Sequence, residues 1–125
     1  MVSRIPVDDA IAAMRGSGGG GQTAYAAAKA GLMGLMIDVA DSFGKHGIRI
    51  NCIAPGIIDT PMRTQAMLQA GVDPKEIDLS FKTSLGIEGD AWDIARTVLF
   101  LAGPDGRYIT GVLIPVDGGV TARSH

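Results

Sequence analysis

Apolar residues recur at the helical period in two stretches of the chain. The first, about 23–43, is rich in alanine and contains no proline, so it predicts a long helix. The second, about 90–102, starts at Asp90, a residue type favoured at the N-cap, and ends before Gly103-Pro104. The stripe expected on the first helix consists of Leu32, Met36, Val39 and Phe43. The stripe expected on the second consists of Ile94, Val98 and Leu101.

Two other stretches, about 48–54 and 109–116, are apolar without a helical period. Strands that are buried on both faces of a parallel sheet have this pattern. Between them, residues 57–88 mix short apolar groups with proline and glycine. They predict a long functional loop with one or two short helices, near 62–70 and 74–80. Helices that alternate with apolar strands indicate an α/β fold with a parallel sheet.

The N-terminal region is of a different kind. Residues 1–15 carry apolar positions at helical spacing, and residues 16–21 are almost entirely glycine. The glycines formally match the G-x-G-x-x-G phosphate-binding pattern, but that pattern requires a preceding strand, and here a helical pattern precedes it. We therefore expect a flexible connector at 16–21.

Composition narrows the class of protein. The chain has 125 residues, 46% of them hydrophobic, a formal net charge of -2 and no basic cluster, which favours one globular domain and argues against nucleic-acid binding. No apolar run is long enough for a membrane span, and no signal peptide is apparent. A single cysteine leaves no internal disulfide framework. We expect a cytoplasmic protein that binds neither nucleic acid nor membrane.

Tyr25 and Lys29 form the strongest local signal for chemistry. They lie one turn apart on the first predicted helix, so both side chains leave the same face. A phenol is a poor acid or base at neutral pH, and a cation held beside it stabilises the phenolate. The same spacing also fits an ordinary surface pair, so the pair alone leaves both interpretations open.

Three segments together resemble one enzyme family. Residues 22–32, which contain Tyr25 and Lys29, resemble the catalytic helix of the short-chain dehydrogenase/reductase family. Residues 46–61, with Pro55-Gly56, resemble its sixth strand and cofactor loop, and residues 109–119 resemble its closing strand. The resemblance implies part of a Rossmann-type domain, a doubly wound parallel sheet that here lacks its N-terminal half.

The resemblance also implies a reaction, a hydride transfer between NAD or NADP and an alcohol or carbonyl substrate. Tyr25 would be the acid/base, and Lys29 would stabilise its phenolate and bind the nicotinamide ribose. Ile58 would bind the carboxamide through its backbone, Thr60 would hold the nicotinamide side, and residues 61–88 would form the substrate loop. The residues expected to bind the cofactor are Tyr25, Lys29, Pro55, Gly56, Ile58 and Thr60. Family members commonly form oligomers through the helix that matches 23–43, so a homo-oligomer is expected.

The sequence also departs from the family pattern. The strand and glycine-rich turn that bind the pyrophosphate are absent, and with them the residue that selects NAD or NADP. The position of the family's catalytic serine falls on Ala12, and Ser17 is the nearest substitute without an assigned role. Residues 1–21 are therefore expected to be a remnant helix with its connector, and 22–125 the C-terminal portion of the domain. An alternative function follows: an inactive remnant that acts at most through self-association.

Several other residues are expected to have structural roles. No His/Cys/Asp cluster has the spacing of metal ligands, so no metal site is predicted. Cys52 is expected to be a buried thiol, and Asn51 to satisfy nearby backbone groups. Trp92 and Phe100 are expected to pack. Residues 117–119, Asp-Gly-Gly, are expected to form a turn that closes the last strand.

Overall fold

The computed structural model describes residues 23–77 and 83–123. Over these ranges the chain divides into two compact units, one made of residues 23–52 with 110–112 and the other of 53–109 with 113–123. The predictions for residues 1–21, including the boundary after residue 21, lie outside the described residues. No helix in the described ranges is long and apolar enough to cross a membrane.

In the first unit, the predicted long helix is confirmed as α2 (Thr23–Phe43). A 3₁₀ turn (Gly44–His46) follows it, and Gly47, at a φ of 78°, ends that turn. The side chains of Met33 and Met36 are buried, whereas Leu32 and Phe43 remain about half exposed. The predicted stripe is therefore wrong at Leu32 and Phe43, because the inward face of α2 passes through Met33.

The same unit joins the chain before the first strand to residues 110–112. The N–H of Gly111 donates to the carbonyl of Ile50 at 2.7 Å. The Oδ1 of Asn51 accepts from the N–H of Val112 at 3.3 Å, so its expected role in satisfying backbone groups is confirmed. Gly111 has a φ of 69°, and a Cβ there would lie 3.1 Å from the Cβ of Ala40 on α2. Only glycine meets both conditions without strain.

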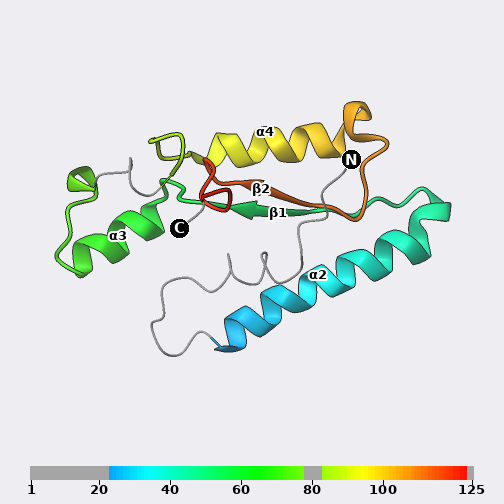
Figure 1. The fold of residues 1–125 in the computed structure, drawn as a ribbon, viewed down its shortest axis with the longest axis horizontal. Helices are drawn as coiled ribbons and strands as arrows, with labels where there is room; N and C mark the ends of the chain where they lie inside the picture. Colours follow the sequence, from blue (N-terminus) through cyan, green and yellow to red (C-terminus); the bar gives the residue numbers. More distant parts are fainter. Residues whose placement is uncertain (1–22, 78–82, 124–125) are drawn as a thin grey trace. The chain divides into compact units, whose positions relative to one another are not determined.

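The two strands, β1 (Cys52–Pro55) and β2 (Leu113–Val116), form a two-stranded parallel sheet (Figure 1). The N–H of Cys52 donates to Val112 and that of Gly56 to Val116, both at 2.9 Å, so the register is constant along the pair. The predicted α/β class with a parallel sheet is confirmed. The predicted strands, 48–54 and 109–116, are too long at their N-terminal ends. Pro55 is the last residue of β1 instead of following it.

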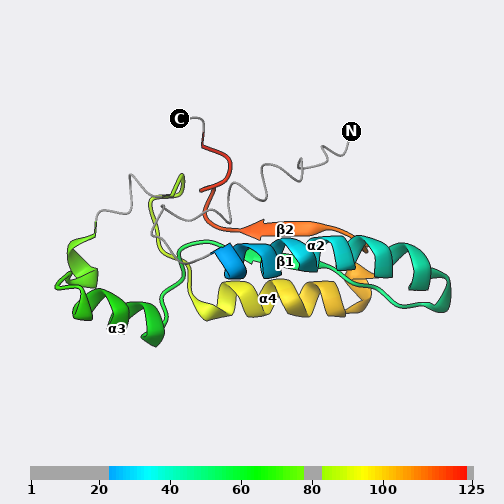
Figure 2. The ribbon, with the colours of Figure 1, turned by 90° about the horizontal axis from the view of Figure 1, so that it is seen from below.

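In the second unit, α4 (Ala91–Ala102) lies along one face of the strands in both ribbon views (Figures 1 and 2). Its N-terminus is a capping box: the Asp90 carboxylate accepts from the N–H of Asp93, and the Asp93 carboxylate accepts from the N–H of Asp90. Leu101 is buried and Ile94 half-buried, as predicted. Val98 is 50% exposed, so that part of the stripe is wrong. Half-buried Thr97 takes the inward position instead.

The expectation that Trp92 and Phe100 pack is also wrong for this chain. Trp92 is 68% exposed and Phe100 about half exposed. Both leave α4 on sides that do not face the strands, because the inward positions belong to Ile94, Thr97 and Leu101.

The loop between the strands carries α3 (Pro61–Gln69), which lies beyond the carboxyl ends of β1 and β2 (Figures 1 and 2). This helix agrees with the one predicted near 62–70. Near 74–80 the described part also contains a short helix, but of the 3₁₀ kind and ending earlier than predicted; residues 78–80 lie outside the described residues. That part is a 3₁₀ turn (Pro74–Glu76) with Asp73 as N-cap, and Ile77 is extended. A proline at the first position starts either kind of helix, but the chain does not continue the α-helical pattern here.

Candidate functional site

The structure brings Tyr25 and Lys29 together on the surface of α2. The Nζ of Lys29 lies 5.5 Å from the centroid of the Tyr25 ring. Lys29 is exposed and Tyr25 is 57% exposed, so the phenol is open to a bound molecule. A cation over an aromatic ring at this distance is a favourable contact, and it holds a positive charge beside the phenol. The structure therefore places the two predicted residues side by side on α2.

The predicted cofactor loop begins where the backbone of β1 meets the end of β2. A Cβ on Gly56 would lie 2.4 Å from the Cα of Asp117 and 2.9 Å from its carbonyl oxygen. The contact is with backbone, so no side chain can rotate away to make room. Pro55 is exposed just before this point, and it has no N–H to offer the sheet. Gly56 therefore lets the loop leave the sheet in close contact with the turn after β2.

Ile58 is held in an extended conformation against Gly89. The N–H of Asp59 donates to the carbonyl of Gly89 at 2.8 Å, and the N–H of Gly89 donates to the carbonyl of Ile57 at 3.0 Å. These two bonds form an isolated parallel bridge between Ile58 and Gly89. Alternate backbone groups of an extended segment point to opposite sides, so the N–H and C=O of Ile58 itself point away from Gly89.

Thr60 is the N-cap of α3. Its Oγ1 accepts from the N–H of Arg63 at 3.3 Å, and Pro61 follows at the first helical position. The carboxylate of Asp59 accepts a hydrogen bond from the hydroxyl of Thr64 at 3.5 Å. The four predicted residues thus lie along the connection from the end of β1, at Pro55, to the start of α3, at Thr60.

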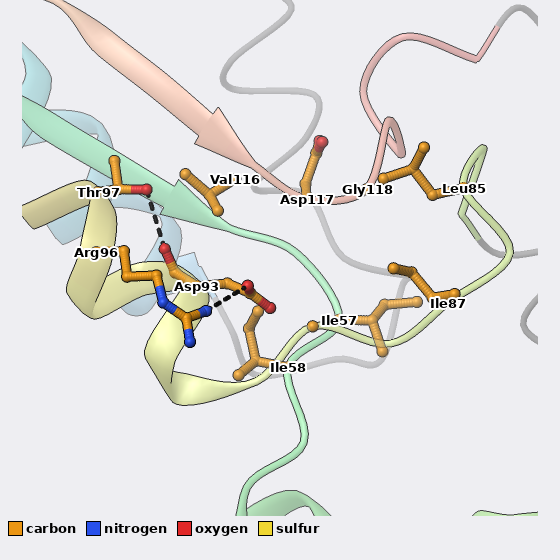
Figure 3. Close-up of a pocket in the computed structure, with 11 residues that line it drawn as sticks. Ile57, Ile58, Leu85, Ile87, Asp93, Arg96, Thr97, Val116, Asp117 and Gly118 are labelled. Carbon is orange, nitrogen blue, oxygen red and sulfur yellow. Dashed lines mark hydrogen bonds and ion pairs between the residues drawn. The ribbon is translucent and has the colours of Figure 1, made fainter.

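A cavity of about 380 Å³ lies against this loop (Figure 3). Aliphatic side chains of the loop, of the segment before α4 and of β2 form most of its wall, and the first turns of α4 contribute polar groups. Its lining residues are Ile57, Ile58, Leu85, Ile87, Gly89, Asp93, Arg96, Thr97, Val116, Asp117 and Gly118. Of these, only Ile58 belongs to the predicted site. The others come from four short stretches, 57–58, 85–89, 93–97 and 116–118, and their local patterns do not indicate that they meet at one cavity.

The Asp117 side chain accepts hydrogen bonds that stabilise the turn after β2, and this turn lines part of the cavity. The Oδ1 of Asp117 accepts from the N–H of Gly119 at 2.9 Å, and its Oδ2 accepts from the N–H and the hydroxyl of Thr121 at 2.9 and 2.7 Å. Burial raises the pKa of this carboxyl, but the hydrogen bonds from Thr121 and from backbone N–H groups outweigh it, so the pKa of Asp117 is lowered. The predicted turn at 117–119 is confirmed. Gly118 and Gly119 take φ values of 62° and 85° within it.

Predictions from the sequence also concern Cys52, Ser17 and Ala12. Cys52 is half-buried in β1, and burial raises the pKa of its thiol, so the neutral thiol is favoured, as a structural cysteine requires. Ser17 and Ala12 lie outside the described residues.

The chain is similar to known proteins over most of its length. A family model described as enoyl-(acyl carrier protein) reductase matches residues 9–121. The chain is 46% identical over 100 residues to the (3R)-3-hydroxyacyl-CoA dehydrogenase of Homo sapiens, a match that covers 80% of the chain and 36% of the human protein.

Solved structures also match most of the chain. Levodione reductase matches with a TM-score of 0.75 and 38% identity, covering 91% of this chain and 45% of that protein. A blue fluorescent protein from a metagenomic library, solved in complex with NADPH, matches with a TM-score of 0.66 and 41% identity, covering 86% of this chain and 41% of that protein. The chain spans less than half the length of these relatives.

Proposed function

The chain belongs to the short-chain dehydrogenase/reductase family, and we propose that it functions in an oxidoreductase that uses NAD or NADP to interconvert an alcohol and a carbonyl compound. The bound nicotinamide would supply the hydride chemistry, and the protein would supply binding and orientation. The substrate would be a small molecule, and the site would act in a soluble, cytoplasmic protein.

The observation that carries this proposal is the backbone of Ile58. Its N–H and C=O point away from the bridge to Gly89, while the neighbouring groups are fixed by hydrogen bonds of 2.8 and 3.0 Å. A nicotinamide carboxamide offers one acceptor and one donor group, which complement this donor and acceptor pair. Gly56 gives the proposal further support, because its lack of a side chain keeps the loop close to the sheet where the cofactor would lie.

Tyr25 and Lys29 would perform the proton chemistry. The Tyr25 hydroxyl would donate a proton to the carbonyl oxygen in the reduction and accept one from the alcohol in the oxidation. Lys29 would stabilise the phenolate and hold the nicotinamide ribose. The contact at 5.5 Å between the ammonium and the ring supports this pairing, as does the exposure of both side chains on one face of α2. Thr60 and Pro55 would complete the cofactor contacts.

The test is a fluorescence titration with NADH and NADPH, followed by an activity assay. Saturable binding is expected, and the stronger binding of one coenzyme would identify the preferred one. Tyr25→Phe is expected to lower turnover by about 10²–10⁴-fold and to weaken coenzyme binding much less, because only the contacts of its hydroxyl are lost. Tyr108→Phe is the matched control, because Tyr108, at 94% exposure, has no part in the site. Turnover that survives Tyr25→Phe would refute the mechanism.

The backbone contact has its own test. Ile58→Pro removes the N–H that would bind the carboxamide, whereas Ile58→Ala keeps it. Loss of one such hydrogen bond is expected to weaken coenzyme binding about tenfold for the proline variant, with a much smaller change for the alanine variant. Equal effects of the two substitutions would mean that the backbone of Ile58 does not bind the coenzyme.

A second candidate function is self-association without turnover. Leu32, Leu35 and Ile37 on α2 are each about half exposed, and apolar side chains gathered on one helix favour contact with another copy. Sedimentation across a concentration range would measure the association. Association that persists in a chain that binds neither coenzyme would favour this second function.

A further inference from the structure

An ion pair joins α3 to the segment before α4. The Nη1 of Arg63, in the first turn of α3, contacts the Oε1 of Glu88. Both side chains are only 23% exposed, so water screens this pair less than it screens a surface pair. The two residues lie far apart in the sequence, and the contact is therefore a tertiary one.

The pair is not explained by the stability of α3. The N-terminus of a helix carries a partial positive charge and favours acidic residues. The first turn of α3 contains no acidic residue, and Arg63 occupies its third position. Its charge is therefore unfavourable for the helix itself. Glu88 neutralises it from a different segment.

The pair lies directly beside the bridge that holds Ile58. Glu88 precedes Gly89, which makes the two backbone hydrogen bonds to Ile57 and Asp59. A Cβ on Gly89 would lie 2.9 Å from the Cδ1 of Ile58, so the two segments are in close contact. Two isolated backbone hydrogen bonds stabilise an extended segment only weakly. The ion pair adds a side-chain link between Glu88 and the start of α3, which directly follows this extended segment.

We propose that the Arg63–Glu88 pair is a positioning clamp that fixes the backbone of Ile58 for its ligand. Neither side chain needs to touch the coenzyme. The clamp holds the loop of residues 57–60 against residues 87–89, so that the N–H and C=O of Ile58 keep one direction. The role of the clamp in coenzyme binding rests on the proposed function, whereas its role in holding the loop does not.

The test uses three charge variants of the full chain: Arg63→Glu, Glu88→Arg and the double swap. Hydrogen exchange of the Asp59 and Gly89 amides reports the bridge without any coenzyme. Each single variant is expected to speed this exchange by about three- to tenfold, and the double swap to restore most of the protection. Arg63→Glu is the sharpest variant, because an acid in this turn suits α3, so faster exchange cannot come from a weakened helix.

Arg107→Glu is the matched control, since it makes the same charge change at an exposed position of the same unit. It is expected to leave exchange at Asp59 unchanged. If a variant loses its helical circular dichroism, exchange is measured instead on the wild-type chain in about 1 M salt. Faster exchange at Asp59 is expected there, because salt weakens the ion pair. Glu88→Gln is expected to abolish this effect of salt. Unchanged exchange in the single variants, or no recovery in the double swap, would overturn the clamp.

Titration with NADH separates the two proposals. The single variants are expected to raise the NADH Kd by about the same factor as the exchange rate, with recovery in the double swap. A wild-type chain that binds no NADH would refute the proposed function, while the exchange data would still decide on the clamp. Faster exchange without any change in the NADH Kd would overturn the positioning role.

Discussion

Gly56→Ala provides the most direct test of the loop geometry. The new Cβ would lie 2.4 Å from the Cα of Asp117 and 2.6 Å from its Cβ. Carbon atoms that are not bonded approach to about 3.5–4.0 Å, so the two chain segments must separate by roughly 1 Å or more. That movement pulls directly on the hydrogen bond from the Gly56 N–H to the Val116 carbonyl, now 2.9 Å long.

The magnitude follows from these two effects. Overpacking against rigid neighbours costs about 1–3 kcal/mol, and a lost or stretched backbone hydrogen bond about 0.5–1.5 kcal/mol. Gly56→Ala is therefore expected to lower the free energy of unfolding by about 2–4 kcal/mol. The same substitution at Gly31, inside α2, meets nothing within 4 Å. Since alanine is the better helix former, Gly31→Ala is expected to stabilise the chain by up to about 1 kcal/mol.

Urea unfolding, followed by far-ultraviolet circular dichroism, measures both variants. With a slope of about 1–3 kcal/mol per molar for a small protein, Gly56→Ala is expected to move the midpoint down by about 1–2 M, and Gly31→Ala to move it slightly up. The same substitution is thus expected to lower the free energy of unfolding at Gly56 and to raise it at Gly31. Equal midpoints for the two variants would refute the close approach of Gly56 to the turn after β2.

Three further predictions follow from single contacts. Leu101→Ala is expected to lower the free energy of unfolding by about 2–5 kcal/mol, because Leu101 is only 7% exposed. Leu99→Ala is expected to lower it by less than about 0.5 kcal/mol, because Leu99 is 73% exposed, and urea midpoints measure both variants. Asp90→Ala breaks the capping box of α4 and is expected to lower the free energy of unfolding by about 1 kcal/mol, which a lower thermal midpoint would show. Because the folded state lowers the pKa of Asp117, its carboxylate stabilises the fold above the ordinary aspartate pKa, and this contribution is lost as the pH falls through the lowered value. Unfolding measured between about pH 2 and 5 is therefore expected to show a shallower loss of stability for Asp117→Asn than for the unaltered chain.

Local patterns in the sequence predicted the main elements well. The alanine-rich stretch without proline gave the bounds of α2, and Asp90 marked the start of α4 correctly. Both depend on interactions within a few residues of one another. The strands were predicted too long, since apolar residues continue before Cys52 and Leu113 but the backbone there makes single contacts in place of a continuous ladder.

Contacts between distant segments were beyond such patterns. Val98 fits the apolar stripe of Ile94 and Leu101 on a helical wheel, yet it is 50% exposed, because burial depends on which face meets the strands. The Arg63–Glu88 pair joins segments 25 residues apart and leaves no local trace in the sequence. The candidate site is divided in the same way. Tyr25, Lys29 and the loop at 55–60 were identified by resemblance, whereas the bridge to Gly89 and the aliphatic wall of the cavity emerged only from the three-dimensional structure.

The register of the sheet has a consequence for how the chain is made. Partners across β1 and β2 lie 60 residues apart, with α3 and α4 between them. A ribosome that adds about 5–20 residues per second needs about 3–12 s to produce those 60 residues. During that interval β2, the partner of β1 among the described residues, has not yet been made, while α4 has its caps as soon as it emerges. The edge of β1 that pairs with β2 is therefore open in the newborn chain for seconds, and a chaperone that covers such edges would act on it in that period.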